Sequence, residues 1–291
     1  MERVRKAVIP AAGMGTRFLP ATKAIPKEML PIVDKPTIQY VVEEAVQSGF
    51  EDIIFVTGQG KNEIEDHFDY DYRLEHRLKE QGKEDLVRIV RNISEMITVS
   101  SIRQKKPLGL GHAVQVAEAF TGDEPFGVFL GDDIVVHKIP CMKQLLRVHE
   151  SYHASVVAVQ EVPWESVSRY GLVAVEPVDS KDHRLFRIRD LVEKPPREKA
   201  PSNLAIIGRY ILTPGVFQAL KKTTPGAGGE IQLTDGLRGL MEEEAVYACR
   251  FEGTRYDAGN KLEYLIATVE FALQREDLQG EFRDYLRSLK L

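Results

Sequence analysis

Cysteine is scarce in this chain of 291 residues, which contains only Cys141 and Cys249. Two cysteines exclude a disulfide framework and a zinc site built from several thiolates. No apolar run approaches the roughly 20 residues that a membrane-spanning helix requires. The apolar stretch 7–10, which follows a charged N-terminus, is too short for the core of a signal peptide. The sequence therefore predicts a cytoplasmic protein with no membrane partner.

The chain also lacks an excess of positive charge, because 39 Lys and Arg face 44 Asp and Glu, for a formal net charge of −5. A mildly acidic balance argues against general binding of nucleic acid. It is compatible with a local basic pocket for an anionic small molecule. Hydrophobic residues make up 43% of the chain and charged residues 29%, as in globular proteins with a buried core.

Strand and helix patterns alternate along the first half of the chain. Strands are expected at 7–10, 52–57, 99–103 and 126–130, and helices at 37–49, 61–68 and 112–120. Regular alternation is typical of a parallel sheet covered by helices on both faces. The sequence therefore predicts an α/β fold.

After about residue 137 the strands come closer together, which predicts a mixed extension of the same sheet. Strands are expected at 154–160, 171–175, 185–193, 205–212 and 246–251, and short helices at 141–150 and 215–222. Residues 262–289 form an amphipathic helical pattern that we expect to break near Gly280. The charged segment 69–93 is predicted to be a solvated surface helix rather than a lid.

A glycine-rich turn, with Gly13 and Gly15, follows the first strand directly. Such a turn presents backbone N–H groups to a phosphate and lets the backbone approach closely. A dinucleotide fingerprint would need a third glycine where Phe18 stands, which disfavours a nicotinamide site. The consensus of a Walker loop is absent as well.

Three cations follow the glycines: Arg17, Lys23 and Lys27. A nucleoside triphosphate carries close to four negative charges, and guanidinium and ammonium groups suit it. The alternative is a tight turn with ordinary surface lysines. The combination of glycines, Arg17 and two lysines favours a phosphate site.

The segments 13–23 and 26–36 resemble the sugar-phosphate nucleotidyltransferases, and among these the bacterial UTP–glucose-1-phosphate uridylyltransferases. Ordered motifs extend the resemblance over nearly the whole chain. It implies a Rossmann-like three-layer α/β/α fold of the nucleotide-diphospho-sugar transferase type, with a mixed, mainly parallel sheet. It also implies Mg²⁺ as cofactor, and UTP, glucose 1-phosphate, UDP-glucose and pyrophosphate as substrates and products.

The resemblance assigns the nucleotide to the first half of the chain. Gln104 is expected to pair with the pyrimidine edge, because one amide offers both a donor and an acceptor. Gly109 would let the backbone meet the base. His112 is expected to cap or pack a helix start rather than act as an acid or base. The remaining candidate nucleotide contacts are Ala11, Ala12, Gly13, Gly15 and Thr16.

Acidic residues near two strand ends are the candidate magnesium ligands. Asp132 follows a buried strand, at the sheet edge where ligands bind. The resemblance implies that Asp257 is the second ligand, and the alternative is that it is the N-cap of the next helix. Asp133 is expected to contact the sugar or to set the loop. Two carboxylates with phosphate oxygens would suffice, because Mg²⁺ prefers oxygen ligands and keeps several waters.

The sugar phosphate is assigned to the second half of the chain. The resemblance gives Glu193 to the sugar hydroxyls and Lys194 to the phosphate, with Gly171 packing against the hexose. Glu230 is expected in a sugar-side loop, and the alternative is that Glu230 or Asp235 caps the following helix.

We expect one domain over 1–291, with a nucleotide half (1–137), a sugar-phosphate half (138–260) and C-terminal helices (261–291) as a candidate contact in a homo-oligomer, a dimer or tetramer. The implied catalytic residues are Arg17, Lys27, Asp132 and Lys194. Three alternatives stay open: a glucose-1-phosphate thymidylyltransferase, a nucleotide-sugar sensor without catalysis and, disfavoured by Phe18, a nicotinamide dehydrogenase.

Overall fold

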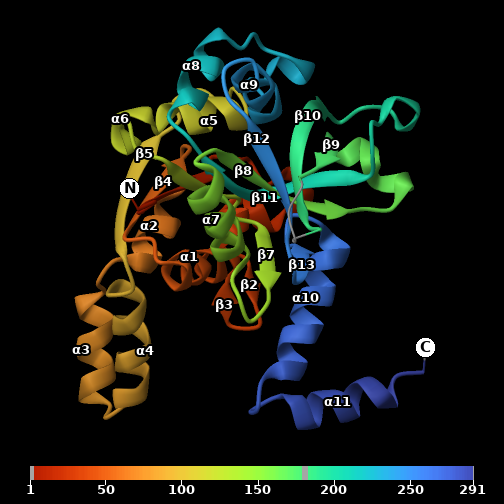
Figure 1. Cartoon of the computed structure of the whole chain (residues 1–291). Helices are drawn as coiled ribbons and strands as arrows, with labels where there is room; N and C mark the ends of the chain where they lie inside the picture. Colours follow the sequence, from red (N-terminus) through yellow and green to blue (C-terminus); the bar gives the residue numbers. More distant parts are fainter. Residues whose placement is uncertain (1–2, 179–182, 291) are drawn as a thin grey trace.

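A nine-stranded sheet forms the centre of the molecule in the computed structural model, which describes residues 3–178 and 183–290 (Figure 1). The strand order is β5-β4-β1-β6-β11-β8-β12-β10-β9. These strands are β1 (Lys6–Ala11), β4 (Asp52–Thr57), β5 (Thr98–Arg103), β6 (Phe126–Phe129), β8 (Ser155–Glu161), β9 (Gly171–Pro177), β10 (Leu185–Glu193), β11 (Leu204–Leu212) and β12 (Val246–Arg250).

Parallel pairing is confined to part of this sheet. Strands β5, β4, β1 and β6 are parallel neighbours, and β8 is parallel to β12. By contrast, β11 is antiparallel to β6 and β8, and β10 is antiparallel to β12 and β9. Strand β9 also pairs with β11 through Leu172 and Ala205, so that β11, β8, β12, β10 and β9 close into a ring.

The expectation of a mainly parallel sheet is therefore wrong, whereas the mixed character is confirmed. The reason lies in the connections. A parallel pair needs a crossover of a dozen or more residues, and β9 ends only eight positions before β10 begins.

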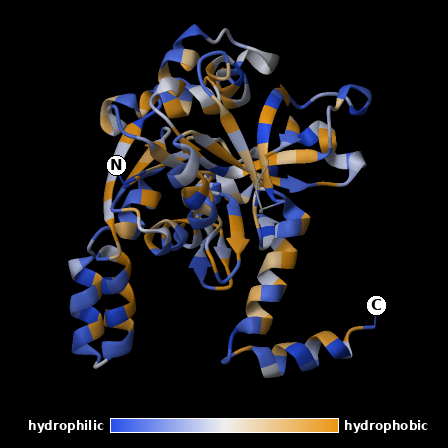
Figure 2. Cartoon of the chain, in the orientation of Figure 1, coloured by the Kyte–Doolittle hydropathy of each residue, from blue (hydrophilic) through white to orange (hydrophobic). Residues whose placement is uncertain are grey.

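Helices cover both faces of the sheet, which confirms the α/β class. Side chains of α1 (Thr37–Ser48), α2 (Asn62–Phe68) and α7 (Cys141–Tyr152) share one hydrophobic cluster with Ala7 and Ile9 of β1. Side chains of α5 (Leu110–Val116), α8 (Gly215–Lys222) and α9 (Leu233–Leu240) share the other cluster with Val8. Successive side chains of a strand point to opposite faces, which explains this division. Figure 2 shows the central strands as largely hydrophobic.

Two helical segments project from this body (Figure 1). The charged segment forms an antiparallel pair, α3 (Tyr72–Glu80) and α4 (Glu84–Ser94). At the other side α10 (Lys261–Gln274) leads to α11 (Gln279–Ser288). The remaining short helix, α6 (Glu118–Thr121), follows α5 and is not part of these projecting segments. The C-terminal break lies at residues 275–278, and Gly280 is inside α11, so the break expected at that glycine comes slightly earlier. Within the described ranges 3–178 and 183–290, no helix is long and apolar enough to cross a membrane.

A small antiparallel sheet was not predicted. Strand β7 (Asp133–Val136) pairs with β13 (Thr254–Asp257), and the register places Asp133 opposite Asp257. This pairing joins two acidic motifs that are far apart in the sequence. A second small sheet, β2 (Pro31–Ile32) with β3 (Lys35–Pro36), supports the turn before α1.

A buried ion pair fixes the loop after β6. The guanidinium of Arg209, which is fully buried, donates to the Glu44 carboxylate at 3.0 and 2.7 Å. It also donates to the carbonyl oxygens of Leu130 (3.3 Å) and Asp133 (2.7 Å). One side chain therefore holds the backbone on both sides of Asp132.

We predict that Glu44→Gln destabilises the protein by roughly 3–5 kcal/mol, because it leaves the buried Arg209 charge without its counter-ion. Urea denaturation measures the free energy of unfolding. The matched control is Glu51→Gln, because Glu51 pairs with Arg3 at an exposed site and such pairs contribute about 0–1 kcal/mol. Equal stability of both variants would refute the role given to this pair.

Candidate active site

The cavity beside the C-terminal end of β1 has a volume of about 500 Å³ and contains most of the residues predicted for the nucleotide. Of the predicted site residues, it is lined by Ala12, Gly13, Gly15, Thr16, Arg17, Lys27, Gln104, Gly109, Asp132 and Glu230. All residues that line the cavity except Glu230 and Gly259 therefore come from the first half of the chain. Ala11 is the last residue of β1, is buried and does not line the cavity.

The glycine-rich loop passes into three short 3₁₀ turns, Thr16–Phe18, Ala21–Lys23 and Lys27–Met29. Gly15 has φ +64°, and a Cβ atom there would lie 3.2 Å from the Cβ atoms of Lys27 and Thr22. The Thr22 hydroxyl donates to the Gly15 carbonyl at 2.7 Å. Glycine is therefore required both for the left-handed conformation and for the close packing of Lys27.

Lys27 and Asp132 form an ion pair across the cavity, with Lys27 Nζ 2.5 Å from Asp132 Oδ2. Burial alone would lower the pKa of Lys27, but the carboxylates of Asp132, Glu28 and Asp257 outweigh it and raise this pKa. Burial would likewise raise the pKa of Asp132, but the Lys27 ammonium keeps it below its ordinary value. Both side chains are therefore charged at neutral pH.

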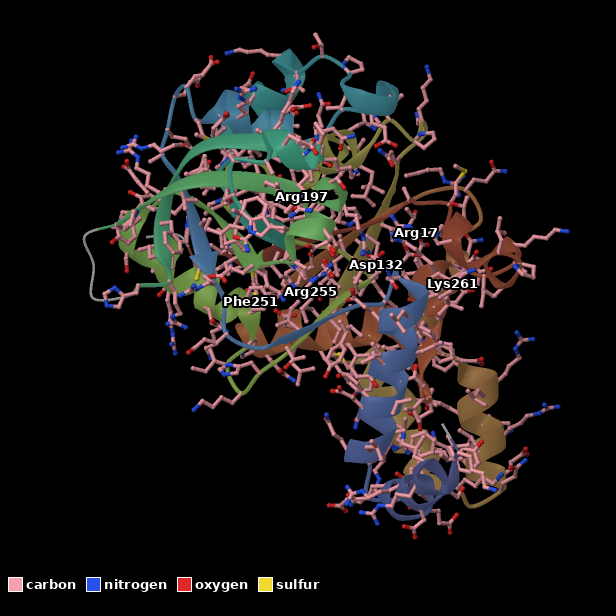
Figure 3. The ribbon with its side chains drawn as sticks, turned by 90° about the vertical axis from the view of Figure 1, so that its right-hand side faces the viewer. Arg17, Asp132, Arg197, Phe251, Arg255 and Lys261 are labelled. Carbon is pink, nitrogen blue, oxygen red and sulfur yellow. The ribbon has the colours of Figure 1, made fainter. Side chains whose placement is uncertain are left out.

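Arg17 lies at the same end of the cavity, where its guanidinium donates to the Gly259 carbonyl at 3.4 Å. Figure 3 shows Asp132 between Arg17 and Arg255 in that view. Lys23, the third cation of the loop, is exposed and does not line the cavity. Two of the three predicted cations, Arg17 and Lys27, therefore line the cavity.

The carboxylates of Asp132 and Asp257 converge at Gly259. A Cβ atom built on Gly259 would lie 2.5 Å from Asp132 Oδ2 and 3.0 Å from Asp257 Oδ1. The N-cap of α10 is Asn260, whose side chain accepts from the N–H groups of Leu262 and Glu263, so Asp257 is not the helix cap. It accepts instead from Gly259 N at 3.0 Å.

This donor set fits Mg²⁺ in its chemistry, because the two carboxylates supply hard oxygen ligands and leave room for waters and phosphate. Among the described residues, no group of three or more His, Cys, Asp or Glu forms a ready metal cage. A metal here would therefore also need oxygens from the nucleotide. Burial and the nearby Asp132 raise the pKa of Asp257, although Arg255 opposes the shift.

Asp133 points away from the cavity. It is buried, and its carboxylate accepts from Gly208 N at 3.1 Å and from Arg255 at 2.6 Å. Of its two predicted roles, setting the loop agrees with these contacts and direct contact with the sugar does not.

Arg255 was missed by the sequence analysis. Besides Asp133, it approaches Asp257 at 3.6 Å, and its guanidinium lies 5.6 Å from the centre of the Tyr170 ring. It therefore links the acidic cluster to the residue that precedes Gly171. The sequence shows this arginine two positions before Asp257, but only the β7–β13 pairing reveals its partners.

The predicted sugar-side residues form a second group. A Cβ atom on Gly171 would lie 2.9 Å from Glu193 Oε2, and the Thr234 hydroxyl donates to the same oxygen at 2.7 Å. The register of β9 and β10 explains the contact, because it pairs Gly171 with Glu193. Lys194 Nζ lies 3.1 Å from Glu193 Oε1 and remains about half exposed. This group does not line the cavity described above, but Arg255 and Tyr170 connect the two.

Glu230 lies with the nucleotide-side residues rather than with Glu193. It lines the cavity, and its Cβ would be 2.8 Å from a Cβ on Gly109. The N-cap of α9 is Gln232, without a side-chain cap, so neither Glu230 nor Asp235 caps that helix. No residue of the projecting α3–α4 pair lines this cavity.

The site has the features of a nucleotide-binding site. It combines a glycine-rich loop, two cations and two converging carboxylates at one edge of a mixed sheet. Residues 6–274 match the model of the nucleotidyl transferase family, and the chain belongs to that family. Within the family, the chain is a member of the UTP–glucose-1-phosphate uridylyltransferases.

The curated relatives match over their full lengths. A UTP–glucose-1-phosphate uridylyltransferase from Bacillus subtilis (strain 168) is 53% identical over 289 residues, which cover 99% of this chain and 98% of that protein. A second one, from Staphylococcus saprophyticus, is 52% identical over 291 residues, and the match covers 100% of both chains.

Solved structures of UDP-glucose pyrophosphorylases have the same fold as this chain. A UTP-bound enzyme of the same kind from Acinetobacter baumannii has a TM-score of 0.91 at 40% identity, covering 99% of this chain and 100% of that one. A UDP-glucose pyrophosphorylase in complex with UDP-glucose has a TM-score of 0.86 at 45% identity, covering 94% and 100%.

We predict that Gly259→Ala weakens divalent-cation binding at least tenfold, because the new methyl group would displace the carboxylate of Asp132. Electron paramagnetic resonance of Mn²⁺ in the presence of UTP measures the affinity. Gly280→Ala is the control, because a Cβ there meets no atom within 4 Å. Unchanged Mn²⁺ affinity in Gly259→Ala would remove Asp132 and Asp257 from the cation site.

Proposed function

We propose that this chain transfers the uridylyl group of UTP to glucose 1-phosphate, forming UDP-glucose and pyrophosphate. The observation that carries the proposal is the cavity in which the glycine-rich loop, Arg17, Lys27 and Asp132 meet. The names of the full-length relatives specify the substrates.

The reaction joins two anions. A phosphate oxygen of glucose 1-phosphate attacks the α-phosphorus of UTP, and pyrophosphate leaves. The nucleophile is already ionised at pH 7, so no general base is needed. Catalysis of this kind relies on positioning and on electrostatic stabilisation of the transferring group.

The loop cations supply that stabilisation in our proposal. Arg17 and Lys27 bind the β- and γ-phosphates and stabilise pyrophosphate as it departs, while Gly13, Gly15 and Thr16 approach the phosphates from the backbone. Lys27 is suited to this role because its raised pKa keeps it charged.

Asp132 and Asp257 are the residues that would hold Mg²⁺. When bound there, the ion polarises a phosphate oxygen as a Lewis acid. The protein's own contribution is to keep Asp132 ionised and aimed into the cavity, through Lys27 and through the Arg209 contacts on either side of it.

We assign the sugar phosphate to the group around Glu193. Its carboxylate accepts from sugar hydroxyls, Lys194 fixes the attacking phosphate, and Gly171 leaves space for the hexose. Positions 1–137 then serve mainly the nucleotide and 138–260 mainly the sugar phosphate within one domain, with Glu230 and Gly259 as exceptions that line the nucleotide cavity. Both hydrophobic clusters contain residues of both halves, which supports this division of labour in a single folding unit.

We further propose that the chain forms a homo-oligomer, a dimer or tetramer, through its C-terminal helices. The support is the exposure of Leu262, Leu265, Ile266 and Tyr285 on α10 and α11.

A panel of nucleoside triphosphates and sugar 1-phosphates, with pyrophosphate release as the readout, tests the function. We expect UTP with glucose 1-phosphate and Mg²⁺ to give the highest kcat/KM. A higher value for dTTP would make the chain a thymidylyltransferase, the alternative that shares Gln104 and the acidic pair. Absence of pyrophosphate release with every pair would favour a nucleotide-sugar sensor.

We also predict that Lys27→Ala lowers kcat by roughly 10²–10³-fold, the loss typical of removing one preorganised electrostatic donor. Circular dichroism should show an intact fold, because Lys27 lies in a short 3₁₀ turn outside the central sheet. Lys23→Ala is the control and should keep turnover near the parent's, since Lys23 does not line the cavity. Turnover of Lys27→Ala close to the parent's would exclude Lys27 from catalysis.

A further inference from the structure

The amide of Gln104 is already engaged within the protein. Gln104 follows β5, is 7% exposed and lines the cavity. Its Nε2 atom donates to the Gly109 carbonyl at 3.1 Å and contacts His112 Nδ1 at 2.9 Å. An amide nitrogen carries two hydrogens, so both are used in these contacts.

The contact with the Gly109 carbonyl establishes the orientation of the Gln104 side-chain amide. A carbonyl oxygen only accepts hydrogen bonds, so the amide atom that faces it must be the nitrogen. Gly109 itself is held in place, because it has φ +99° and a Cβ there would lie 2.8 Å from Ile231 O. The Gly109 carbonyl also accepts from Ala113 N at 3.1 Å.

The contact with His112 then decides the state of the imidazole ring. Because Gln104 Nε2 is the donor, Nδ1 of His112 must be an unprotonated acceptor, and the ring is neutral with its hydrogen on Nε2. Burial lowers the pKa of His112, which agrees with a neutral ring. The N-cap of α5 is Gly109, so of the two roles predicted for His112, capping is wrong, whereas packing at the helix start stays a prediction.

This arrangement revises the expectation that Gln104 offers the base both a donor and an acceptor. With both amide hydrogens used, Oε1 is the polar atom that Gln104 has left for a ligand. An oxygen opposite ring atom N3 accepts from the N3–H of uracil, but it faces a lone pair on the N3 of cytosine.

We propose that His112 is a specificity-determining positioning residue that holds Gln104 as a pure acceptor and thereby selects uracil over cytosine. The inference deepens the proposed function and rests on it. His112 does not line the cavity, so in this proposal it acts through Gln104. Thymine also carries N3–H, so this device does not separate UTP from dTTP.

The test compares kcat/KM for UTP and for CTP in the parent, in His112→Leu and in His112→Gln. We expect His112→Leu to lower the UTP:CTP ratio about threefold to tenfold, the effect of losing one ordinary hydrogen bond. His112→Gln supplies an acceptor again and should restore at least half of that loss on a logarithmic scale. The KM for glucose 1-phosphate should stay unchanged in both variants, because His112 acts only on the selection of the base. This KM is also the control for a general structural defect, which would alter it.

A UTP:CTP ratio in His112→Leu equal to the parent's, with the parent active, would overturn the role of His112. Failure of the parent to form UDP-glucose would instead refute the proposed function. If His112→Leu does not fold, ¹⁵N NMR of the parent's His112 ring decides the matter. An unprotonated Nδ1 coupled to the Gln104 amide is the expected result, and a protonated Nδ1 would contradict the proposal.

Discussion

The ion pair between Lys27 and Asp132 is the interaction on which the site depends. It joins the loop after β1 to the loop after β6, across a cavity that both residues help to line. Parallel strands β1 and β6 are neighbours, so their C-terminal ends meet at one edge of the sheet. Charges of opposite sign are thereby held within 2.5 Å where two phosphate esters would meet. Burial shifts the pKa of each group toward its neutral form, and the charge of the partner opposes that shift.

Several buried contacts keep this pair in position. Arg209, paired with Glu44, holds the backbone on both sides of Asp132. Glu28, next to Lys27 in the sequence, is buried and accepts from Lys61 at 2.9 Å. Arg255 pairs with Asp133 and approaches Asp257. Its positive charge therefore offsets the repulsion among the carboxylates of Asp132, Asp133 and Asp257. The structure thus balances the charges of the site before any ligand binds.

The sequence allowed the prediction of those parts of the site that lie in short, ordered motifs. The glycine-rich turn, Gln104 and Asp132 each lie shortly after a predicted strand, Lys27 lies in the loop that continues the turn, and the fold brings all four to one cavity. Asp133 shows the limit of such reasoning, because two adjacent aspartates look equivalent in a sequence. The pairing of β7 with β13 turns Asp133 toward Arg255, and that pairing joins segments about 120 residues apart. The ring closure of β9 onto β11 and the contact of Gln104 with His112 likewise depend on tertiary packing that no local pattern encodes.

The central claim is that Lys27 and Asp132 act as one unit, and a double-mutant cycle on the rate of UDP-glucose formation tests it most directly. Lys27→Met, Asp132→Asn and the double variant would be compared with the parent under saturating substrates. Residues that act as a unit give grossly non-additive losses, so the account predicts that the double variant loses about as much as the worse single variant. A double variant whose logarithmic loss equals the sum of the two single losses would contradict it.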